Sequence, residues 1–554
     1  MEKKSPFYRL WLLLAADKQD VKSIYFYAIV SGLVQLTVPI GVQAIIGFVL
    51  GANMVTSIYI LILLVVAGVL LVGIFQINQM RIIEKIQQSI FTRYAFEFTE
   101  RIPRFDLQKV DNMYLPELIN RFFDTQNLQK GLAKILIDLP LATIQILFGL
   151  LLLSLYHPFF IGFGLLLVTI IFFMLRMTAN KGIETSFKES SYKYEVVAWL
   201  EEMARVIKSF KFTQGTNLNL LKTDANLVNY LKSRTLHFQI LVFQYSMLVF
   251  FKVAVTASML LLGTYLLINQ QLNIGEFIAA EIVILTVISA VEKLIGNLDS
   301  VYDVVTSLEK LSSVTEGALE SEGQHELNVS KGIQIDLKDF EFSYSDGKKA
   351  ISNLSVEIPA NSSVCISGPE GAGKTTLLKI LSGSYKDNKG TVLFNKIPLN
   401  NYRLESLRSS TGIYLSQQDL FIGTVWENIT MGRHDIDADK IISIANKLSI
   451  ENFLDFMPNG FETIIDPAGK RLSSSVAKKI LLLRAMANSP KLLLLDEPWL
   501  GLDSNEKNKM INYLLNENVN TTSIIVSNDS DFAKMCDYHI VMEIGSARVY
   551  KNKA

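Results

Sequence analysis

Six apolar stretches constrain this chain more than any other feature of its sequence. A helix needs about 20 mostly apolar residues to cross the hydrocarbon core of a bilayer. The stretches all lie before residue 300, and they are Ile24–Leu50, Ser57–Gln79, Ile135–Tyr156, Pro158–Met177, Phe238–Ile268 and Ile274–Gly296. This pattern predicts an α-helical polytopic membrane domain with six transmembrane helices, and it excludes a fold that is water-soluble throughout.

The segments between the stretches differ in length and in charge. Roughly 55 residues separate the second stretch from the third, roughly 60 separate the fourth from the fifth, and each segment carries nine Lys and Arg residues. The short connections carry none. Positively charged loops remain on the cytoplasmic side, so we expect both long segments and both chain termini in the cytoplasm. The helical apolar spacing of Glu184–Phe212 predicts that the spans continue beyond the bilayer as long helices.

The composition excludes several other classes of protein. The chain has 53 Lys and Arg residues and 53 Asp and Glu residues, and this balance gives no electrostatic basis for nucleic-acid binding. Half of the residues are hydrophobic, which excludes intrinsic disorder. The two cysteines, Cys365 and Cys536, are too few for a disulfide-rich scaffold or a four-ligand zinc site.

The N-terminal residues do not match a cleavable signal peptide, because the apolar run Leu10–Ala16 is too short. Trp11 and the neighbouring Lys and Arg residues suit a helix that lies in the membrane interface and contacts lipid. An ordinary amphipathic start to the first transmembrane helix is the alternative interpretation.

The sequence changes in character near residue 326. Short β-rich runs then alternate with helical segments, and the runs are Ile333–Leu337, Ser363–Ser367, Thr391–Phe394, Leu492–Leu495 and Ser523–Val526. Such alternation predicts an α/β domain with a largely parallel sheet. We therefore expect a membrane domain at residues 1–325 and an α/β domain at residues 326–554.

A phosphate-binding loop follows the run Ser363–Ser367. The residues from Gly368 to Thr376 match the pattern G-x-x-x-x-G-K-[ST] between a strand and a helix. Glycine lets the backbone N–H groups converge on phosphate oxygens. We expect nucleotide binding by Gly368, Pro369, Glu370, Gly371, Ala372, Gly373, Lys374, Thr375 and Thr376. Within this loop Lys374 is predicted to face the β- and γ-phosphates, and Thr375 to ligate Mg²⁺.

The segment Lys491–Pro498 supplies the second part of this site. Four leucines form a buried strand that leads to Asp496 and Glu497. Asp496 is predicted to hold the Mg²⁺ shell, and Glu497 to polarise the attacking water. The two motifs together predict an α/β P-loop nucleotide-binding domain that hydrolyses ATP, with ATP and Mg²⁺ as cofactors.

These motifs resemble, in order and spacing, those of an ATP-binding cassette (ABC) exporter half-transporter, and the resemblance covers nearly the whole chain. It implies that Tyr344, in Phe342-Ser-Tyr344, stacks on adenine. It also implies that Gln417, in Tyr414-Leu-Ser-Gln-Gln418, contacts Mg²⁺ and water. Further matches are Gly423–Ile429, Gly460–Thr463 and Gly469.

Within the family, the membrane half resembles the type I secretion and peptide-exporting branch, through Val291–Ile295 and Asp299–Val314. The branch implies a polypeptide substrate, a periplasmic adaptor and an outer-membrane channel; a lipid or small-molecule substrate stays open. Some members carry an N-terminal peptidase domain, and we expect none here because the first span begins at Ile24. Arg121–Asp124 and Trp199–Met203 lie where the family places its coupling elements.

Three motifs depart from the family. The L-S-G-G-Q signature reads Leu472-Ser-Ser-Ser-Val476, which keeps Ser473 for action in trans but loses both glycines. Asn528 replaces the switch histidine and cannot carry the charge of an imidazole. The D-loop S-A-L-D reads Leu500-Gly-Leu-Asp503. Because two chains form each ATP site in the family, every dimer that contains this chain is expected to have altered sites and slow turnover.

The sequence thus predicts ATP-driven export across the plasma (inner) membrane by a dimer with a second half-transporter, either identical or different. The predicted catalytic residues are Glu497, Lys374, Ser473 and Asn528. A rival reading is a catalytically impaired pseudo-transporter that binds ATP as a structural or regulatory ligand in a membrane assembly. The altered signature and Asn528 favour the rival, whereas the intact Lys374, Asp496 and Glu497 disfavour it.

Overall fold

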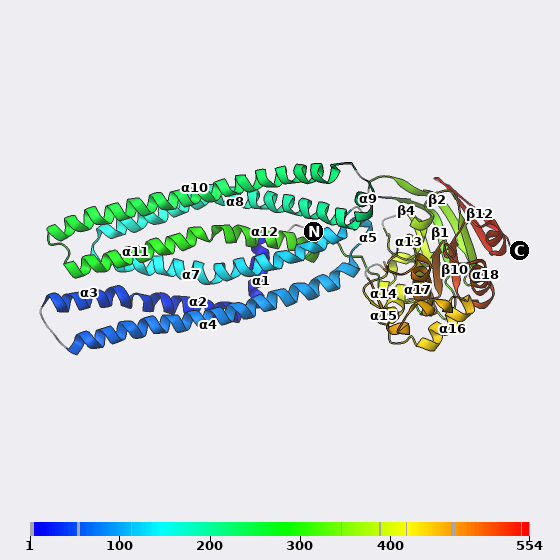
Figure 1. Cartoon of the computed structure of the whole chain (residues 1–554), viewed down its shortest axis with the longest axis horizontal. Coiled ribbons are helices and arrows are strands. Elements are labelled where there is room, and N and C mark those ends of the chain that lie inside the picture. Colours follow the sequence, from blue (N-terminus) through cyan, green and yellow to red (C-terminus); the bar gives the residue numbers. More distant parts are fainter. Residues whose placement is uncertain are drawn as a thin grey trace. The chain divides into compact units, whose positions relative to one another are not determined.

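The computed structural model describes residues 5–51, 56–111, 113–213, 215–344, 346–386, 389–416, 418–466, 469, 471–544 and 546–552. The chain divides into two compact units. The first comprises Met1–Pro103 and Met113–Gly317, and the second comprises Arg104–Asn112 and Ala318–Ala554. The first unit is a bundle of long helices, and the second is built around β-sheets (Figure 1).

The helices of the first unit confirm the predicted spans. They are α1 (Pro6–Ala16), α2 (Lys18–Gln35), α3 (Thr37–Leu50), α4 (Thr56–Arg101), α6 (Leu115–Asn120), α7 (Asp124–Tyr156), α8 (Phe159–Arg205), α9 (Ile207–Phe212), α10 (Leu218–Ile268), α11 (Ile274–Gly296) and α12 (Leu298–Thr315). In the described parts of the chain, six helical segments are long and apolar enough to cross a membrane. The helices α4, α8 and α10 have 46, 47 and 51 residues, more than twice the about 20 that a bilayer needs, so the predicted extensions are present.

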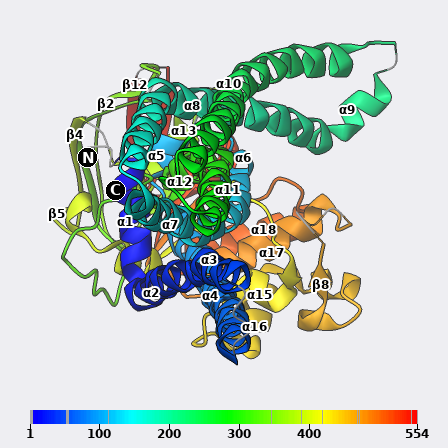
Figure 2. The same ribbon diagram turned by 90° about the vertical axis from the view of Figure 1, so that its left-hand side faces the viewer.

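The helices of the first unit pack in pairs, and the first span is divided into two helices. The helices α8 and α10 lie side by side, and α7 packs against α11 and α12 (Figure 2). A Cβ atom at Gly32 would lie 2.3 Å from Ile144 Cγ2, so glycine allows α2 and α7 to approach. The first span consists of α2 and α3, which meet at Leu36, with Pro39 in the first turn of α3.

The N-terminal helix α1 is attached to α12 by a buried arginine. The guanidinium of Arg9 donates to both carboxylate oxygens of Glu316, at 2.9 and 2.8 Å, and also to Glu309. Phe7 and Trp11 are exposed on α1. An exposed aromatic face suits the membrane interface, and the interfacial position of α1 stays a prediction.

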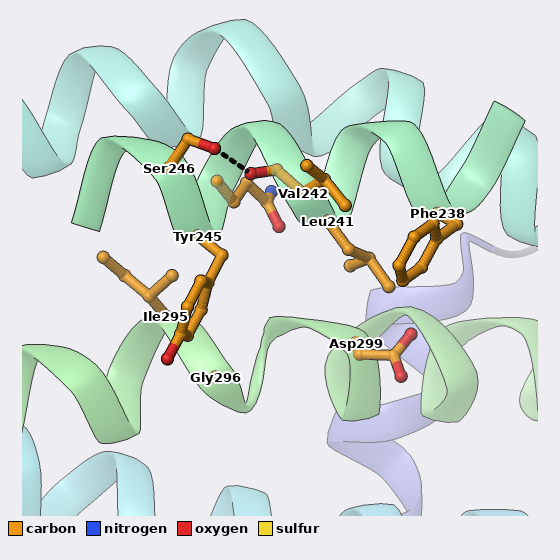
Figure 3. A pocket seen from close by; sticks show the side chains of 9 residues that line it. Phe238, Leu241, Val242, Tyr245, Ser246, Ile295, Gly296 and Asp299 are labelled. Atoms are coloured by element: carbon orange, nitrogen blue, oxygen red, sulfur yellow. Dashed lines mark hydrogen bonds between the residues drawn. The ribbon is translucent and has the colours of Figure 1, made fainter. Parts of the chain in front are cut away.

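A cavity of about 380 Å³ lies between α10 and the junction of α11 with α12 (Figure 3). Tyr245 of α10 and Ile295 of α11 extend toward each other across it, and Phe238 points toward Asp299. The carboxylate of Asp299 lies 3.3 Å from Nε2 of the buried His237. The cavity therefore combines apolar walls with one carboxylate that already has a partner.

The second unit contains a six-stranded, largely parallel sheet in the order β12-β11-β3-β10-β9-β6. Its strands are β3 (Ser363–Ser367), β6 (Thr411–Tyr414), β9 (Leu492–Asp496), β10 (Thr522–Val526), β11 (Tyr538–Glu543) and β12 (Ser546–Lys551). Only β12 pairs antiparallel among these described strands. Every residue of β9 and β10 is buried, as expected for central strands that are covered on both faces.

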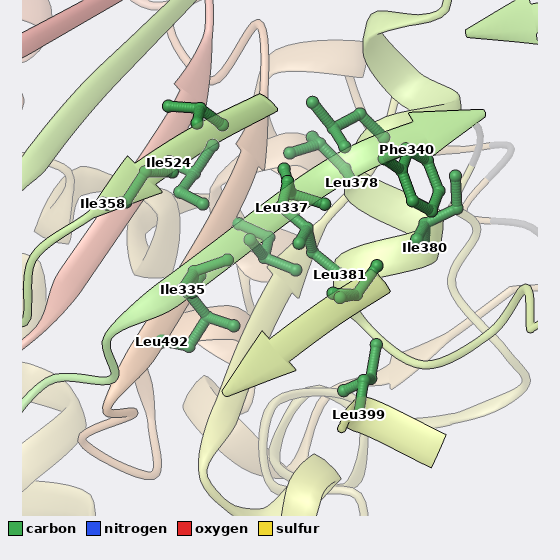
Figure 4. Packing of buried hydrophobic residues seen from close by; sticks show 14 of the residues in the cluster. Ile335, Leu337, Phe340, Ile358, Leu378, Ile380, Leu381, Leu399, Leu492 and Ile524 are labelled. Carbon is green, nitrogen blue, oxygen red and sulfur yellow. The ribbon is translucent and has the colours of Figure 1, made fainter. Parts of the chain in front are cut away.

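A second, antiparallel sheet has the order β2-β1-β4-β5. It comprises β1 (Ile335–Ser343), β2 (Lys349–Ile358), β4 (Lys389–Phe394) and β5 (Ile397–Pro398), and a separate pair joins β7 (Gly423–Thr424) to β8 (Ile464–Ile465). The helices of this unit are α5 (Leu107–Val110), α13 (Lys374–Leu381), α14 (Leu404–Ser409), α15 (Val425–Thr430), α16 (Ala438–Leu448), α17 (Ser474–Met486), α18 (Ser504–Asn512) and α19 (Ser530–Met535). Leu337 of β1 packs with Leu378 of α13 and Ile524 of β10 in one buried cluster, which joins the two sheets through α13 (Figure 4).

The predicted β-rich runs all form strands, but two of them belong to the antiparallel sheet. Ile333–Leu337 overlaps β1, and Thr391–Phe394 lies within β4. A segment from the membrane half of the sequence also belongs to the second unit, because Phe105 pairs with Leu319 in an antiparallel bridge. The side chain of Phe105 is only 3% exposed, so this segment is part of the core of the unit.

Candidate nucleotide-binding site

The parallel sheet brings three of the predicted motifs to one edge. The strands β3, β10 and β9 are neighbours and run in the same direction. Gly368 follows β3, Asn528 follows β10, and Asp496 ends β9. Ligands of open parallel sheets bind outside the carboxyl ends of the strands, so this edge is the candidate site.

The phosphate loop adopts a conformation that requires glycine. Gly368, Gly371 and Gly373 have φ values of 147°, 79° and 87°, which residues with a side chain rarely adopt. A Cβ atom at Gly368 would lie 2.0 Å from the carbonyl oxygen of Met542, and one at Gly373 would lie 2.4 Å from that of Ala350. The loop leads directly into α13, whose free N–H groups and helix dipole favour an anion at this position.

The loop encloses the ammonium group of Lys374. Its Nζ donates to the carbonyl oxygens of Gly368 at 2.7 Å and Pro369 at 2.8 Å. Phosphate oxygens are stronger acceptors than carbonyl groups because they are charged. Lys374 is therefore already positioned for the phosphate chain of a nucleotide.

A hydroxyl group and a carboxylate form the candidate Mg²⁺ position. Thr375 Oγ1 donates to Asp496 Oδ2 at 3.0 Å, and Ser416 Oγ donates to the same oxygen at 3.3 Å. Asp496 is buried. Mg²⁺ prefers oxygen ligands and commonly takes one or two from the protein and the others from phosphates and water, so this set fits the ion. Ser416 was not predicted; its only signal in the sequence is its place beside Gln417.

Glu497 has a strained backbone and a shifted pKa. Its φ is +49°, a left-handed conformation that costs a residue with a side chain about 1–3 kcal/mol, and its N–H donates to the carbonyl of Val526 at 3.0 Å. Burial raises the pKa of Glu497, and the charge of Asp496 raises it further, whereas Lys374 and the backbone N–H of Asn528 oppose the shift. A carboxylate with a raised pKa beside a phosphate loop is a candidate general base.

Asn528 and Tyr344 both contact the phosphate loop. Asn528 Oδ1 accepts a hydrogen bond of 3.0 Å from the N–H of Gly368. The hydroxyl of Tyr344 lies 2.6 Å from Thr376 Oγ1. The structure therefore brings both predicted residues to the candidate site, while Gln417 lies outside the described residues.

The altered signature lies at the start of α17. The hydroxyl of Ser473 accepts a hydrogen bond of 3.2 Å from the N–H of Val476 and caps the helix. Ser474 and Ser475 occupy the first two helical positions. Lys478, which the sequence did not single out, donates to the carbonyl of Leu500 at 2.9 Å and so joins α17 to the D-loop. Action of Ser473 on the nucleotide of a partner stays a prediction.

Two family models match the chain. The ABC transporter transmembrane region matches residues 23–291, and the ABC transporter model matches residues 351–500. The first of these regions overlaps all six apolar segments of the first unit, and the second includes the phosphate loop, Asp496 and Glu497.

Several curated proteins are similar over part of their length. The Lactococcin-G-processing and transport ATP-binding protein LagD of Lactococcus lactis subsp. lactis is 25% identical over 77% of this chain and 61% of its own. The mitochondrial iron-sulfur clusters transporter ATM1 of Gibberella zeae is 31% identical over 45% of this chain and 37% of its own. The Beta-(1-->2)glucan export ATP-binding/permease protein NdvA of Rhizobium meliloti is 25% identical over 53% of this chain and 51% of its own. The matches thus span less than two thirds of these relatives.

A solved structure shares the fold over nearly the whole chain. It is that of a bacterial Atm1-family ABC exporter with ATP bound, with a TM-score of 0.86 and 16% sequence identity. The likeness covers 97% of this chain and 96% of the other. At this identity, the comparison establishes the common fold.

Proposed function

The chain belongs to the ABC transporter family as a half-transporter, with a transmembrane domain fused to an ABC nucleotide-binding domain, and from that premise we propose that it is an ATP-driven exporter. In this proposal residues 1–325 provide the transmembrane domain and residues 326–554 the nucleotide-binding domain, although the compact unit of the latter also includes Arg104–Asn112 and begins at Ala318. Two such chains, or this chain and a different half-transporter, close their nucleotide-binding domains on two ATP–Mg²⁺ and move a substrate outward.

One observation carries the proposal: the geometry at the carboxyl ends of β3 and β9. Lys374 is enclosed by the phosphate loop, Thr375 is hydrogen-bonded to Asp496, and Glu497 follows in the chain. These are the parts that phosphoryl transfer from ATP to water requires: a cation on the phosphates, a metal position and a base.

Each residue has a distinct role in hydrolysis. The loop N–H groups and Lys374 bind the phosphates, and Thr375 and Asp496 hold Mg²⁺, which neutralises the developing charge when bound. Glu497 orients the attacking water and takes its proton. Burial keeps this carboxylate more basic than usual, which favours proton transfer as long as Glu497 is ionised.

Turnover is expected to be slow because both partners of each ATP site are altered. The Cβ atoms of Ser474 and Ser475 keep the start of α17 farther from a γ-phosphate than glycine would. The side-chain oxygen of Asn528 is an acceptor and is bonded to Gly368, so it does not bind the γ-phosphate in this arrangement. In a homodimer each ATP site combines the altered signature of one chain with Asn528 of the other. In a heterodimer with an unaltered partner, one ATP site contains the altered signature and the other contains Asn528.

The proposed orientation and substrate are supported by the charge pattern and by one relative. The two positively charged segments favour cytoplasmic termini, and the proposed location is the plasma (inner) membrane. LagD, which matches 77% of this chain, is named for processing and transport of lactococcin G. A polypeptide is therefore the proposed substrate class, and a periplasmic adaptor and an outer-membrane channel are proposed partners.

A second candidate function is a pseudo-transporter that uses ATP as a structural or regulatory ligand. The bond between Asn528 and Gly368 favours it, because that bond stabilises the loop without contributing to catalysis. Equilibrium ATP binding and ATP-dependent uptake of labelled polypeptide, measured on the full chain in inside-out proteoliposomes, separate the two functions. Binding with uptake supports the exporter, binding without uptake or hydrolysis supports the second function, and absence of binding contradicts both.

A further inference from the structure

A hydrogen-bonded aromatic group connects the candidate adenine site with the Arg104–Asn112 segment. The hydroxyl of Tyr385 donates to Asp111 Oδ2 at 2.8 Å and accepts from Lys379 Nζ at 3.1 Å. The side chain of Tyr385 is 1% exposed. Burial, together with the bond to Asp111, raises the pKa of Tyr385, so the hydroxyl stays protonated and donates. The bond is therefore a charge-assisted contact between a buried hydroxyl and an exposed carboxylate.

The ring of Tyr385 continues this connection toward the phosphate loop. Phe342 stacks on Tyr385 with 5.4 Å between ring centroids and an interplanar angle of 5°. The ring of Tyr344 meets both Phe342, at 5.3 Å, and Tyr385, at 6.1 Å, in edge contacts. Aromatic pairs in stacked and edge contacts attract each other beyond the area they bury, so the three rings restrict one another.

Tyr344 is in turn attached to the start of α13. Its hydroxyl lies 2.6 Å from Thr376 Oγ1, two residues after Lys374. Asp111, Tyr385, Phe342, Tyr344 and Thr376 thus form a continuous path of contacts inside the second unit.

The Arg104–Asn112 segment is held to this unit at several further points. Asp106 N–H donates to the carbonyl of Ala318 at 3.0 Å, and Lys386 N–H donates to Gln108 Oε1 at 3.3 Å. Both neighbours of the segment in the chain, Pro103 and Met113, belong to the first unit, so the segment is covalently linked to that unit at both ends.

We propose that Tyr385 is a positioning residue, which passes the position of Asp111 to Tyr344 and so sets the orientation of the ring on which the nucleotide base stacks. The proposal rests on the proposed function, which assigns the base to Tyr344. It predicts that the affinity for the base part of ATP depends on Asp111, although Asp111 is not one of the residues of the candidate nucleotide-binding site. The affinity for the phosphate part is independent of it, because Lys374 and the loop N–H groups are held by other contacts.

The test compares ATP with inorganic tripolyphosphate, which offers the phosphate chain without a base. Equilibrium binding of each, with Mg²⁺, is measured on the purified full chain in lipid nanodiscs. Tyr385→Phe keeps the stacked ring and removes the hydroxyl, and Asp111→Asn keeps the shape and removes the charge. Each is expected to raise the Kd for ATP about three- to tenfold and to leave the Kd for tripolyphosphate unchanged. The double variant is expected to match Tyr385→Phe alone, because without the hydroxyl the side chain at position 111 has no bond to Tyr385 left to weaken.

Two matched controls make the same chemical changes elsewhere. Tyr402 is also buried, and its hydroxyl donates to the carbonyl of Phe394 at 2.9 Å, so Tyr402→Phe removes a comparable bond away from Asp111. Asp106→Asn removes a charge from the same segment and keeps an N-cap for α5. Neither is expected to change either Kd.

The outcomes separate this proposal from the proposed function. Unchanged ATP binding in Asp111→Asn and Tyr385→Phe, with weakened binding in Tyr344→Ala, overturns the role of Tyr385 alone. Unchanged ATP binding in Tyr344→Ala overturns the assignment of the base to Tyr344. Equal weakening of ATP and tripolyphosphate would mean a general loss of structure and would also contradict the proposal. Asp111 is exposed, so Asp111→Asn remains informative if a core variant fails to fold.

Discussion

Asn528 Oδ1 accepts a hydrogen bond of 3.0 Å from the backbone N–H of Gly368, the first residue of the phosphate loop. The residue that replaces the family's switch histidine is therefore hydrogen-bonded to the phosphate loop of the same chain. Its amide Nδ2 can donate to a phosphate, but unlike a protonated imidazole it carries no positive charge. This contact gives a structural reason for the slow turnover that the sequence predicts.

Restoring the imidazole should accelerate hydrolysis. Asn528→His provides a donor for the γ-phosphate that can carry a positive charge and removes the bond to Gly368, and we expect kcat for ATP to rise about tenfold. Asn528→Ala is the control, because it removes the same bond without adding a donor. Equal rates for the two variants in a steady-state phosphate-release assay would contradict this role.

Restoring the signature glycines should act on the same step. The double substitution Ser474→Gly and Ser475→Gly lets the start of α17 approach a nucleotide more closely, and we expect a further increase in kcat. It should also lower the stability of the domain by about 0.5–1 kcal/mol per glycine in thermal unfolding. Ser530→Gly makes the same change at the first position of α19 and should alter stability alone.

The raised pKa of Glu497 predicts two pH effects. Hydrolysis requires the carboxylate, so kcat should fall on the acid side at a pH above the ordinary glutamate value of 4.5. A folded-state pKa above the unfolded one means that the ionised group destabilises the fold at pH values above the folded pKa, and that this cost disappears below the unfolded pKa. Glu497→Gln should therefore raise the Tm at about pH 7 and not at about pH 4.

Asp529 provides a control for which the expected change in Tm has the opposite sign. Its hydrogen bond to Lys507, at 2.5 Å, is the main cause that lowers the pKa of Asp529. The stability that it contributes is present above the ordinary aspartate value of 3.8 and is lost as the pH falls through the lowered one. Asp529→Asn should lower the Tm at about pH 7, and the same sign for both variants would refute the assignment.

A buried ion pair holds the signature helix to the helix after the D-loop. Lys479 Nζ of α17 lies 2.5 Å from Glu506 Oε1 of α18, with side chains 7% and 5% exposed. Glu506→Gln leaves a buried ammonium without its counter-ion, and we expect a loss of about 3–5 kcal/mol in chemical unfolding. The exposed pair Lys534–Asp531 is the comparison, and Asp531→Asn should cost less than about 1 kcal/mol. Similar losses for both would contradict the burial argument.

The sequence was most informative where a local pattern determines the structure. The run Ser363–Ser367 coincides with β3. It could be predicted because the run is mostly apolar and the glycine that begins the phosphate loop follows it directly. The six spans could be predicted because a bilayer demands a minimum apolar length. The buried leucines of β9 likewise indicated the positions of Asp496 and Glu497.

Contacts between distant parts of the chain could not be predicted from such patterns. Phe105 pairs with Leu319, and Tyr385 bonds to Asp111, across more than 200 residues of sequence. The bond that Gly368 N–H donates to Asn528 depends on the order of strands in the sheet, which periodicity does not reveal. Hydrophobic spacing defines which face of an element is buried and leaves its partner open.

The most direct test of the proposed ATPase function is steady-state ATP hydrolysis by the purified full chain in lipid nanodiscs, compared with Glu497→Gln. We expect slow hydrolysis that depends on Mg²⁺ and is abolished by Glu497→Gln, with ATP binding retained in both proteins. Hydrolysis that persists in Glu497→Gln, or a chain that does not bind ATP, would contradict the proposed function.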